Sequence, residues 1–341
     1  MASVSAHYAQ TSAWSSLKAD AGWRASRVAV VEGSDIVAGA QLLFRPLPAA
    51  LGTVGYVPKG PVLAADNADH ASAVMDALLD DAKRHRMRWL GVQPPTAGGA
   101  VELELADRLF HVNPGIGTPA TTLRLDLGKS SDELLADMSK WTRRNIRRGE
   151  SRGITTRLGG EDDIATFVRL RQEASRRKQF YTRSEDYYGE MWRIFRAAGQ
   201  MELFLAEYEE EVVSGMLTIT FGNTAYAHAS AWSGKHGTHK PNEVLEWAAI
   251  CWAQAAGYKY FDLEGIVATE TDTTATQTQP AESASADPYV TAYKMGFGGQ
   301  IVAVPQAYEH LPNPLLRWGY RQLYPRVERS AIVAKIRRRI Y

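Results

Sequence analysis

Polar side chains that could do chemistry occur at a few places along the chain of 341 residues. Arg183 and Tyr187 lie in the segment RRKQFYTRSEDYY, and Lys294 lies in YKMGFGG. Tyr226 and His228 occupy alternate positions of a predicted strand, TAYAHASAW, and so face the same side of a sheet. An arginine can hold a phosphate or carboxylate, a tyrosine can hold a sugar or peptide, and a lysine can stabilise negative charge that develops in acyl transfer. Each residue taken alone is more typical of a structural role.

Positive charge is concentrated in two segments of an almost neutral chain. The 39 Lys and Arg residues nearly balance the 38 Asp and Glu residues, so contact with nucleic acid would need a local patch. The first patch lies in a helix predicted over 131–149, whose basic residues share one face: Lys140, Arg143, Arg144, Arg147 and Arg148. The second patch, in 315–341, includes Arg337, Arg338 and Arg339. Both suit the phosphates of an RNA, and a solvated helix surface is the plain alternative.

Familiar catalytic and metal-binding motifs are missing from the sequence. It contains no GxSxG, GxxxxGK[ST] or HExxH motif, and no GxGxxG after a predicted strand. The single cysteine, Cys251, excludes an intramolecular disulfide and lies in an apolar helix, where we expect it to be inert. His236 and His239 have a metal-like spacing, but no carboxylate or cysteine nearby completes a set of ligands. We therefore expect no metal and no cofactor.

The sequence predicts a cytoplasmic protein without stable membrane insertion. Its first residues, MASVSAHYAQTSAW, lack the basic and apolar regions of a signal peptide. The longest strongly apolar stretch, 247–257, is far shorter than the roughly 20 residues that span a bilayer.

The elements that would position these residues repeat along the chain. Residues 28–44 and 203–221 each have the pattern of a β-hairpin with a glycine in its second strand. A helix and a further strand follow each hairpin, at 68–86 and 89–92 in the first half and at 241–256 and 258–263 in the second.

This repeat predicts a mixed α/β fold of two similar domains, at 1–145 and 146–310. Chance similarity between two generic βαβ units is the alternative. The Thr/Ser/Ala-rich residues 268–288 are predicted to form a mobile loop. Residues 311–341 are predicted to form a basic helical tail, which packs back on the protein or contacts RNA.

Six further segments lie in order along most of the chain. They are YVPKGPV (56–62), KWTRRNIRRGESRGI (140–154), FVRLRQEASRRKQFYTRSEDYY (167–188), LFLAEYEEEVVSGML (203–217), PNEVLEWAAICWAQAAGYKYFDLEGI (241–266) and YKMGFGG (293–299). On these segments the sequence resembles the FemABX family of aminoacyl-tRNA-dependent peptidyl transferases. It is similar to the short type, because no heptad segment for a coiled-coil arm is present.

The resemblance implies two GNAT-like domains and an aminoacyl transfer. A small amino acid such as alanine, glycine or serine would move from aminoacyl-tRNA to a free amine of a peptide. The usual acceptor is the stem peptide of a peptidoglycan precursor, either UDP-linked or lipid-linked. Because the ester of aminoacyl-tRNA is already activated, an aligned amine can attack it without an acyl-enzyme.

The resemblance also implies roles for individual residues. Lys294 matches the lysine that stabilises charge at the ester. Lys18, in WSSLK, and Arg183 match residues that hold the phosphate region of the acceptor. Tyr187 and Tyr226 fall where tyrosines of the acceptor site occur. The arginines of the two basic patches would contact the tRNA.

Three more residues are assigned to the acceptor site, namely Gln93, His228 and Tyr293. Gln93 stands where an acidic residue is expected, and His228 stands where a tyrosine is expected. Such departures would suit a different acceptor, such as the peptidyl nucleoside scaffold of a uridyl peptide antibiotic. A CoA-dependent GNAT N-acyltransferase and a non-enzymatic RNA-binding protein are further alternatives, although we find no Q/RxxGxG/A loop for a CoA pyrophosphate.

Overall fold

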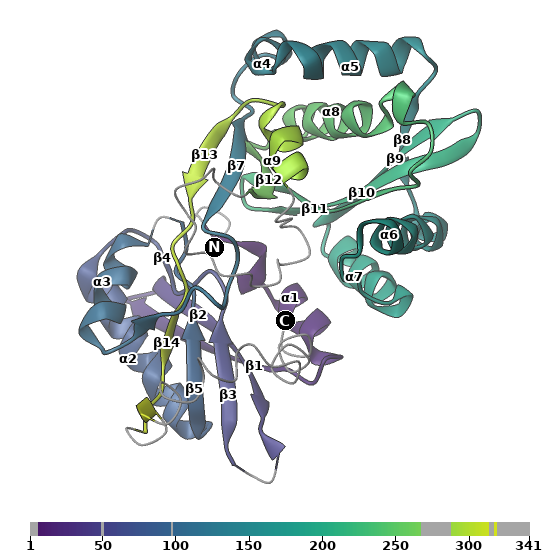
Figure 1. Ribbon diagram of the computed structural model, residues 1–341. Helices are drawn as coiled ribbons and strands as arrows, with labels where there is room; N and C mark the ends of the chain where they lie inside the picture. Colours follow the sequence, from purple (N-terminus) through teal and green to yellow (C-terminus); the bar gives the residue numbers. More distant parts are fainter. Residues whose placement is uncertain (1–5, 49–50, 97, 267–287, 314–316, 319–341) are drawn as a thin grey trace.

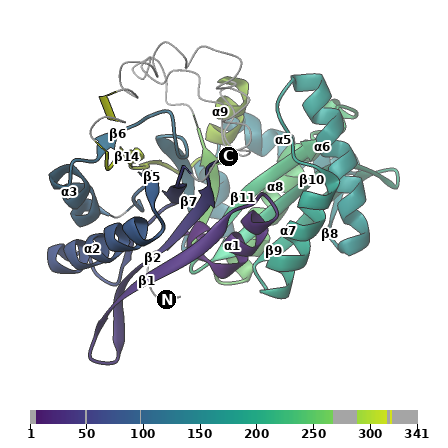
Figure 2. The same ribbon diagram turned by 90° about the horizontal axis from the view of Figure 1, so that it is seen from below.

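A computed structural model describes residues 6–48, 51–96, 98–266, 288–313 and 317–318. Within these residues the chain forms two lobes, each built on one seven-stranded mixed sheet (Figure 1; Figure 2). The expected mixed α/β fold of two similar units is confirmed. The predicted loop at 268–288, apart from its last residue, lies outside the described residues, as do Arg337, Arg338 and Arg339.

Lobe 1 contains the first sheet, with strand order β1-β2-β3-β5-β14-β6 and with β4 paired to β2. Its elements are β1 (Arg24–Glu32), β2 (Asp35–Pro46), β3 (Thr53–Val57), β4 (Val62–Leu63), α2 (Ala68–Arg84), β5 (Met87–Val92), α3 (Gly99–Asp107), β6 (His111–Val112) and β14 (Tyr308–His310). Val74, Met75 and Leu78 form an apolar stripe on α2 and share one fully buried core with Leu42 and Leu90 of the sheet.

Lobe 2 contains the second sheet, with strand order β13-β7-β12-β11-β10-β9-β8. Its elements are β7 (Thr121–Asp126), α4 (Ser131–Asp137), α5 (Lys140–Ser151), β8 (Thr155–Gly159), α6 (Ile164–Lys178), α7 (Glu185–Ala197), β9 (Met201–Tyr208), β10 (Glu211–Phe221), β11 (Thr224–Trp232), α8 (Pro241–Ala255), β12 (Tyr260–Gly265), α9 (Pro288–Met295) and β13 (Gln300–Ala303). Alternate residues of β9 enter different cores: Leu203 packs with α6 and α7 on one face, and Phe204 packs with α8 on the other.

Both lobes contain the predicted unit of a hairpin followed by a parallel βαβ crossover. In lobe 1 the hairpin β1–β2 is followed by β3, α2 and β5, and in lobe 2 the hairpin β9–β10 is followed by β11, α8 and β12. The helices predicted at 68–86 and 241–256 are therefore confirmed as α2 and α8.

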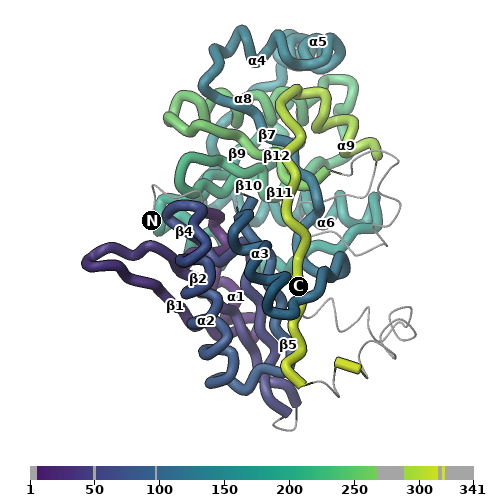
Figure 3. The backbone as a smooth tube through the Cα atoms, turned by 90° about the vertical axis from the view of Figure 1, so that its left-hand side faces the viewer, coloured from purple at the N-terminus to yellow at the C-terminus, as the bar shows by residue number. Residues whose placement is uncertain are grey.

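The chain passes from the first sheet to the second at β7 and returns to the first sheet at β14. β7 pairs with β12 and β13 in lobe 2, and β14 returns to pair with β5 and β6 in lobe 1 (Figure 3). The chain thus enters the second sheet ahead of residue 145, the boundary expected from the sequence, and it is back in the first sheet by residue 310. Such pairing between distant segments has no local sequence signal, which is why the predicted boundaries divide the chain differently.

The single helix predicted over 131–149 is wrong, because the chain forms two helices there, α4 and α5. Met138 is extended between them, and the Ser139 side chain accepts a hydrogen bond from the backbone N–H of Thr142. This serine caps the second helix and so starts a new one. The first helix is capped by Ser130, in a capping box with Glu133.

Candidate active site between the lobes

A cavity of about 940 Å³ lies between the two lobes and is lined by residues from both. It brings together all eight side chains that the sequence suggested for catalysis and acceptor binding: Lys18, Gln93, Arg183, Tyr187, Tyr226, His228, Tyr293 and Lys294. The N-terminal helix α1 (Ser12–Ala19) contributes Lys18 because it packs on α7 of lobe 2, where Leu17 is fully buried.

The cavity lies where two parallel strands of lobe 2 diverge. β11 and β12 pair over three residues, Thr224–Tyr226 against Tyr260–Asp262, although both strands continue further. After Asp262 the register of β12 against β7 shifts, and Glu264 adopts a φ of 58°, a left-handed conformation that is rare for residues other than glycine. This irregularity in the strand places the Glu264 side chain in the wall of the cavity.

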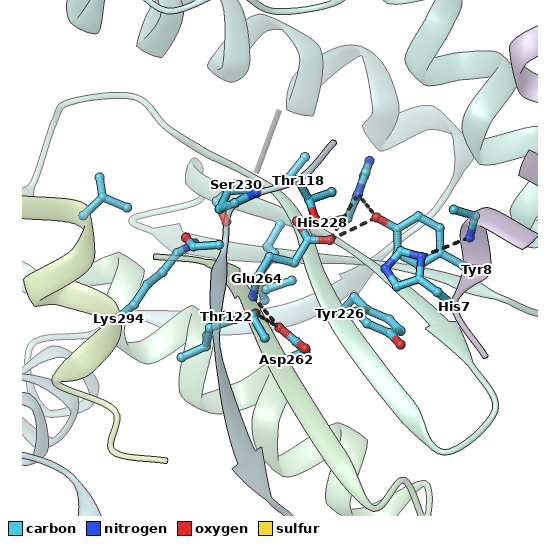
Figure 4. A pocket seen from close by; sticks show the side chains of 18 of the residues that line it. His7, Tyr8, Thr118, Thr122, Tyr226, His228, Ser230, Asp262, Glu264 and Lys294 are labelled. Carbon is cyan, nitrogen blue, oxygen red and sulfur yellow. Dashed lines mark hydrogen bonds and ion pairs between the residues drawn. The ribbon is translucent and has the colours of Figure 1, made fainter. Parts of the chain in front are cut away.

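Two nearly buried carboxylates, Asp262 and Glu264, lie at this point (Figure 4). Asp262 accepts hydrogen bonds from the Thr122 hydroxyl and from the backbone N–H of Glu264, the latter at 2.7 Å. Burial raises the pKa of Asp262, and the Arg124 guanidinium, 3.5 Å away, acts against that rise. One oxygen of Glu264 accepts a hydrogen bond from the Tyr8 hydroxyl at 3.1 Å. Among the described residues, its other oxygen, Oε2, is buried without a partner.

Aromatic side chains surround Glu264 on the side of the N-terminal segment. The Tyr8 hydroxyl lies 3.2 Å from Nδ1 of His228, and that nitrogen lies 3.6 Å from the Glu264 carboxylate. The rings of Tyr8 and Tyr226 pack edge to face, with centroids 5.2 Å apart. Burial raises the pKa of Tyr8, and the Glu264 carboxylate raises it further. Tyr8 therefore stays a neutral hydrogen-bond donor to the carboxylate.

Lys294 approaches the carboxylates from the opposite side, on α9 (Figure 4). Its Nζ donates a hydrogen bond of 2.8 Å to the carbonyl of Gly265. Burial lowers the pKa of Lys294, and the carboxylates of Glu264, Glu246 and Asp262 oppose that shift. Burial also raises the pKa of Glu246, a residue of α8, to about 7. The side chain of Tyr293 interacts with Glu246. The arrangement holds one half-buried cation within electrostatic range of three carboxyl groups.

Three of the predicted acceptor-binding residues gather at another part of the cavity. Nζ of Lys18 lies 4.4 Å from the ring centroid of Trp14 and 5.8 Å from that of Tyr187. The guanidinium of Arg183 lies 5.2 Å from the same Tyr187 ring. Both cations therefore stack on one tyrosine, an arrangement that can hold an anionic group between them.

Gln93 lies in the wall of the cavity with all of its side-chain polar atoms engaged. Its amide nitrogen donates to the Thr118 hydroxyl at 3.0 Å and to the Pro305 carbonyl at 3.2 Å. Its amide oxygen accepts from the Tyr56 hydroxyl at 3.2 Å and from the Thr118 backbone N–H at 3.1 Å. This network holds the loop before β7 against β3 and β5, which is a structural task.

Several polar residues of the cavity were not predicted from the sequence, namely Tyr8, Lys59, Arg124, Glu246, Asp262 and Glu264. Asp262 and Glu264 lie in the segment YFDLEGI, where two carboxylates at alternate positions near a strand end were an available signal. Arg124, His228, Glu246 and Glu264 each have a buried polar side-chain atom without a hydrogen-bond partner in the part of the chain described. Such atoms are uncommon in folded proteins and indicate a place for a ligand or water.

The arginines of α5 lie outside the cavity and divide into two kinds. Arg143 donates three hydrogen bonds, of 2.7 to 2.9 Å, to the carbonyls of Leu135, Ala136 and Met138, and so caps the end of α4. Arg144 and Arg147 are exposed, and Arg148 is half-buried. The exposed pair retains the charge that a polyanion would need.

Three other features lie away from the cavity. Cys251 is half-buried, and burial raises the pKa of its thiol to about 11, as expected for an inert cysteine. His236 and His239 pack against the Tyr208 ring, and no group of three metal-ligating side chains occurs among the described residues. None of the helices in the described ranges has the length and apolar character needed to cross a bilayer.

Comparisons with known proteins agree with this architecture. The FemAB family matches residues 1–104, and an acetyltransferase (GNAT) domain matches residues 136–271. The chain is 25% identical, over 239 residues, to the lipid II:glycine glycyltransferase of Staphylococcus aureus strain MRSA252. The matched region is 67% of this chain and 56% of the relative, so the chain spans little more than half of that protein.

Solved structures share the fold at low sequence identity. A crystal structure of FemX superimposes with a TM-score of 0.81 at 19% identity, over 93% of this chain and 94% of FemX. A tandem GNAT protein from the clavulanic acid biosynthesis pathway matches with a TM-score of 0.51 at 14% identity, over 86% of this chain and 84% of that protein. The longest helix in the described ranges, α2, has 17 residues, so no long helical arm projects from them. The chain is therefore similar to FemAB proteins in part of its sequence and in its fold.

Proposed function

We propose that the cavity joins an amino acid, carried as the ester of an aminoacyl-tRNA, to a free amine on the stem peptide of a peptidoglycan precursor. The observation that carries the proposal is a cluster where β11 and β12 diverge, in which the half-buried Lys294 lies with the nearly buried Asp262 and Glu264. A cation and carboxylates in one site suit a reaction in which an ammonium loses a proton and an oxyanion forms. The similarity to a lipid II:glycine glycyltransferase supports this choice of acceptor.

The reaction requires positioning and charge but no covalent enzyme intermediate. The acceptor ammonium gives one proton to Glu264, which lines the cavity. The resulting amine forms a bond to the ester carbonyl carbon, and the oxyanion that develops is stabilised by the Lys294 ammonium. The carbon–oxygen bond to the ribose then breaks, and the second proton of the nitrogen passes to the ribose oxygen. The products are an amide and a free tRNA end.

The remaining residues would position the two substrates. Lys18 and Arg183, which share the Tyr187 ring, would bind the acceptor phosphates, and Tyr226 would contact its peptide. Arg144 and Arg147 of α5 would contact tRNA phosphates.

A second candidate, a CoA-dependent acyltransferase, is favoured by the match of residues 136–271 to an acetyltransferase domain. The diverging strands β11 and β12 could hold an acyl thioester as well as an RNA ester.

One experiment tests the proposed aminoacyl transfer and its acceptor. The protein is incubated with a pool of charged tRNAs and with UDP-linked pentapeptide, lipid-linked pentapeptide or a peptidyl nucleoside. The molecular masses of the acceptors are then measured by mass spectrometry. We expect one aminoacyl residue to be added to a pentapeptide, and the addition to stop when the tRNA is digested with RNase first. A mass shift on the peptidyl nucleoside alone would identify that compound, and not a peptidoglycan precursor, as the acceptor. No shift on any acceptor would contradict the proposal.

A further inference from the structure

Lys59 is a buried cation that the proposed chemistry does not use. It lies in the cavity wall of lobe 1, just after β3, and is 6% exposed. Among the residues that the structure describes, its ammonium forms no hydrogen bond or ion pair, although Asp262 and Glu264 act on it electrostatically. A buried charge without a partner is unfavourable, so this ammonium is expected to meet an opposite charge when a ligand is bound.

The turn that carries Lys59 is held from both sides. The Pro58 carbonyl accepts a hydrogen bond of 2.6 Å from the Gln10 side chain, and the Gly60 N–H donates one of 2.9 Å to the Gln93 carbonyl. Lys59 itself has a φ of 54°, in the left-handed region that is strained for a lysine. Strain of this kind persists where the surroundings fix it, and it is common at ligand-binding positions.

Lys59 also lies within electrostatic range of the two carboxylates across the cavity. Burial lowers the pKa of Lys59 to about 7, and Asp262 and Glu264 act against this shift. When it is protonated, Lys59 thus presents a positive charge from lobe 1 to a cavity where lobe 2 presents Asp262 and Glu264, beside Arg124 and Lys294. A purely anionic ligand would be repelled by the carboxylates, and an uncharged or cationic ligand would leave Lys59 without a partner.

We propose that Lys59 binds a carboxylate that the acceptor carries on the same carbon as its reacting amine. The cavity would then select a zwitterionic amino-acid end, with the carboxylate on Lys59 and the amine against Glu264 and Asp262. This inference rests on the proposed function. It predicts an acceptor whose third residue is diaminopimelate, because lysine has no carboxylate beside its side-chain amine.

The test compares two UDP-linked pentapeptides that differ at that residue alone. Their Kd values are measured by calorimetry without tRNA, for the intact protein and for Lys59→Met. We expect the protein to bind the diaminopimelate peptide at least about tenfold more tightly than the lysine peptide. Lys59→Met should weaken the first complex about tenfold and change the second by less than about twofold.

Further variants of the protein serve as controls for this comparison. Lys59→Arg should recover part of the preference, and Lys83→Met, a surface change on α2 of the same lobe, should leave both Kd values unchanged. Lys59→Gln replaces Lys59→Met if the latter does not fold. Equal binding of the two peptides, or equal weakening of both by the variant, would overturn the inference. If both peptides are bound equally and aminoacylated, the inference alone fails, whereas failure to bind either one removes the proposed acceptor as well.

Discussion

The parallel strand pairs of the two lobes have the same place in the fold but different shapes. In lobe 1, β3 and β5 stay paired to their ends, from Thr53 opposite Met87 to Val57 opposite Val92. Hydrogen bonds from Gln93 to Val57 and from Gly60 to Gln93, each 2.9 Å, continue this pairing. In lobe 2, β11 and β12 separate after three paired residues.

This difference explains why the reactive cluster is found in one lobe. The open pair leaves room for a bulge that carries Glu264 and for Lys294 to approach from α9. The closed pair has Gln93 at the corresponding strand end, with its amide fully hydrogen-bonded. The two similar lobes thus differ at the cavity, where lobe 2 has a diverging strand pair and lobe 1 has a closed one.

The largest effect is expected from Lys294→Met in the open lobe. If the ammonium meets charge that develops in the transition state, kcat/KM for aminoacyl transfer should fall by about 10²-fold to 10³-fold. Lys83→Met in the closed lobe is the matched control, because that lysine lies on the surface of the crossover helix α2. Steady-state transfer assays measure both, and unchanged kinetics for Lys294→Met would remove this residue from the mechanism.

Glu246 should make the stability of the open lobe depend on pH. Burial raises its folded-state pKa from 4.5 to about 7, so its contribution is fully present below about pH 4.5 and is lost as the pH rises through about 7. The 2.5-unit difference between these two pKa values corresponds to about 3 kcal/mol. Denaturant unfolding between pH 4.5 and 8 should show this decline, and Glu246→Gln should reduce it. Burial also raises the pKa of Asp262, so part of the pH dependence of stability should remain in this variant. An identical slope in Glu246→Gln would contradict the assignment.

Gln93→Ala should affect the stability of the closed lobe. The substitution leaves the Tyr56 hydroxyl and two groups of Thr118 without their partner. The free energy of unfolding should fall by about 1–3 kcal/mol. Chemical denaturation measures this change. A variant of unchanged stability with a raised KM for the acceptor would instead make Gln93 a ligand-binding residue, as the sequence first suggested.

The smallest effect is expected on the surface of α5. The double variant Arg144→Ala/Arg147→Ala should weaken tRNA binding a few-fold and reduce the slope of log K against log salt by about 1.5–2. The control is the double variant Lys83→Ala/Arg84→Ala on α2, which removes the same number of positive charges from lobe 1. If the two double variants weaken binding equally, the effect is one of net charge and α5 is not the contact surface.

Local patterns in the sequence predicted much of the fold. The two hairpins and the crossover helices α2 and α8 have clear periodicity and end signals, so their positions were predictable. The placement of β7 in the second sheet and of β14 in the first was not predictable, because pairing between distant strands has no local pattern. The break between α4 and α5 depends on one capping serine, Ser139, within a strongly helical stretch.

The candidate site was predicted in part. Residue types and resemblance led to Lys294, Arg183 and Tyr226, which line the cavity. Glu264 was missed because its role depends on a left-handed backbone angle inside a strand, which the sequence does not display. Lys59 was missed for a similar reason: in the sequence, a lysine after a predicted strand resembles any surface lysine, whereas the fold buries this one.

The most direct test of the central claim asks which activated acyl donor the open lobe accepts. The protein is given UDP-linked pentapeptide together with a radiolabelled aminoacyl-tRNA or, separately, with labelled acetyl-CoA. We expect label to reach the acceptor from the tRNA ester, Lys294→Met to abolish most of this transfer, and acetyl-CoA to give none. Transfer from acetyl-CoA, with none from any charged tRNA, would contradict this expectation.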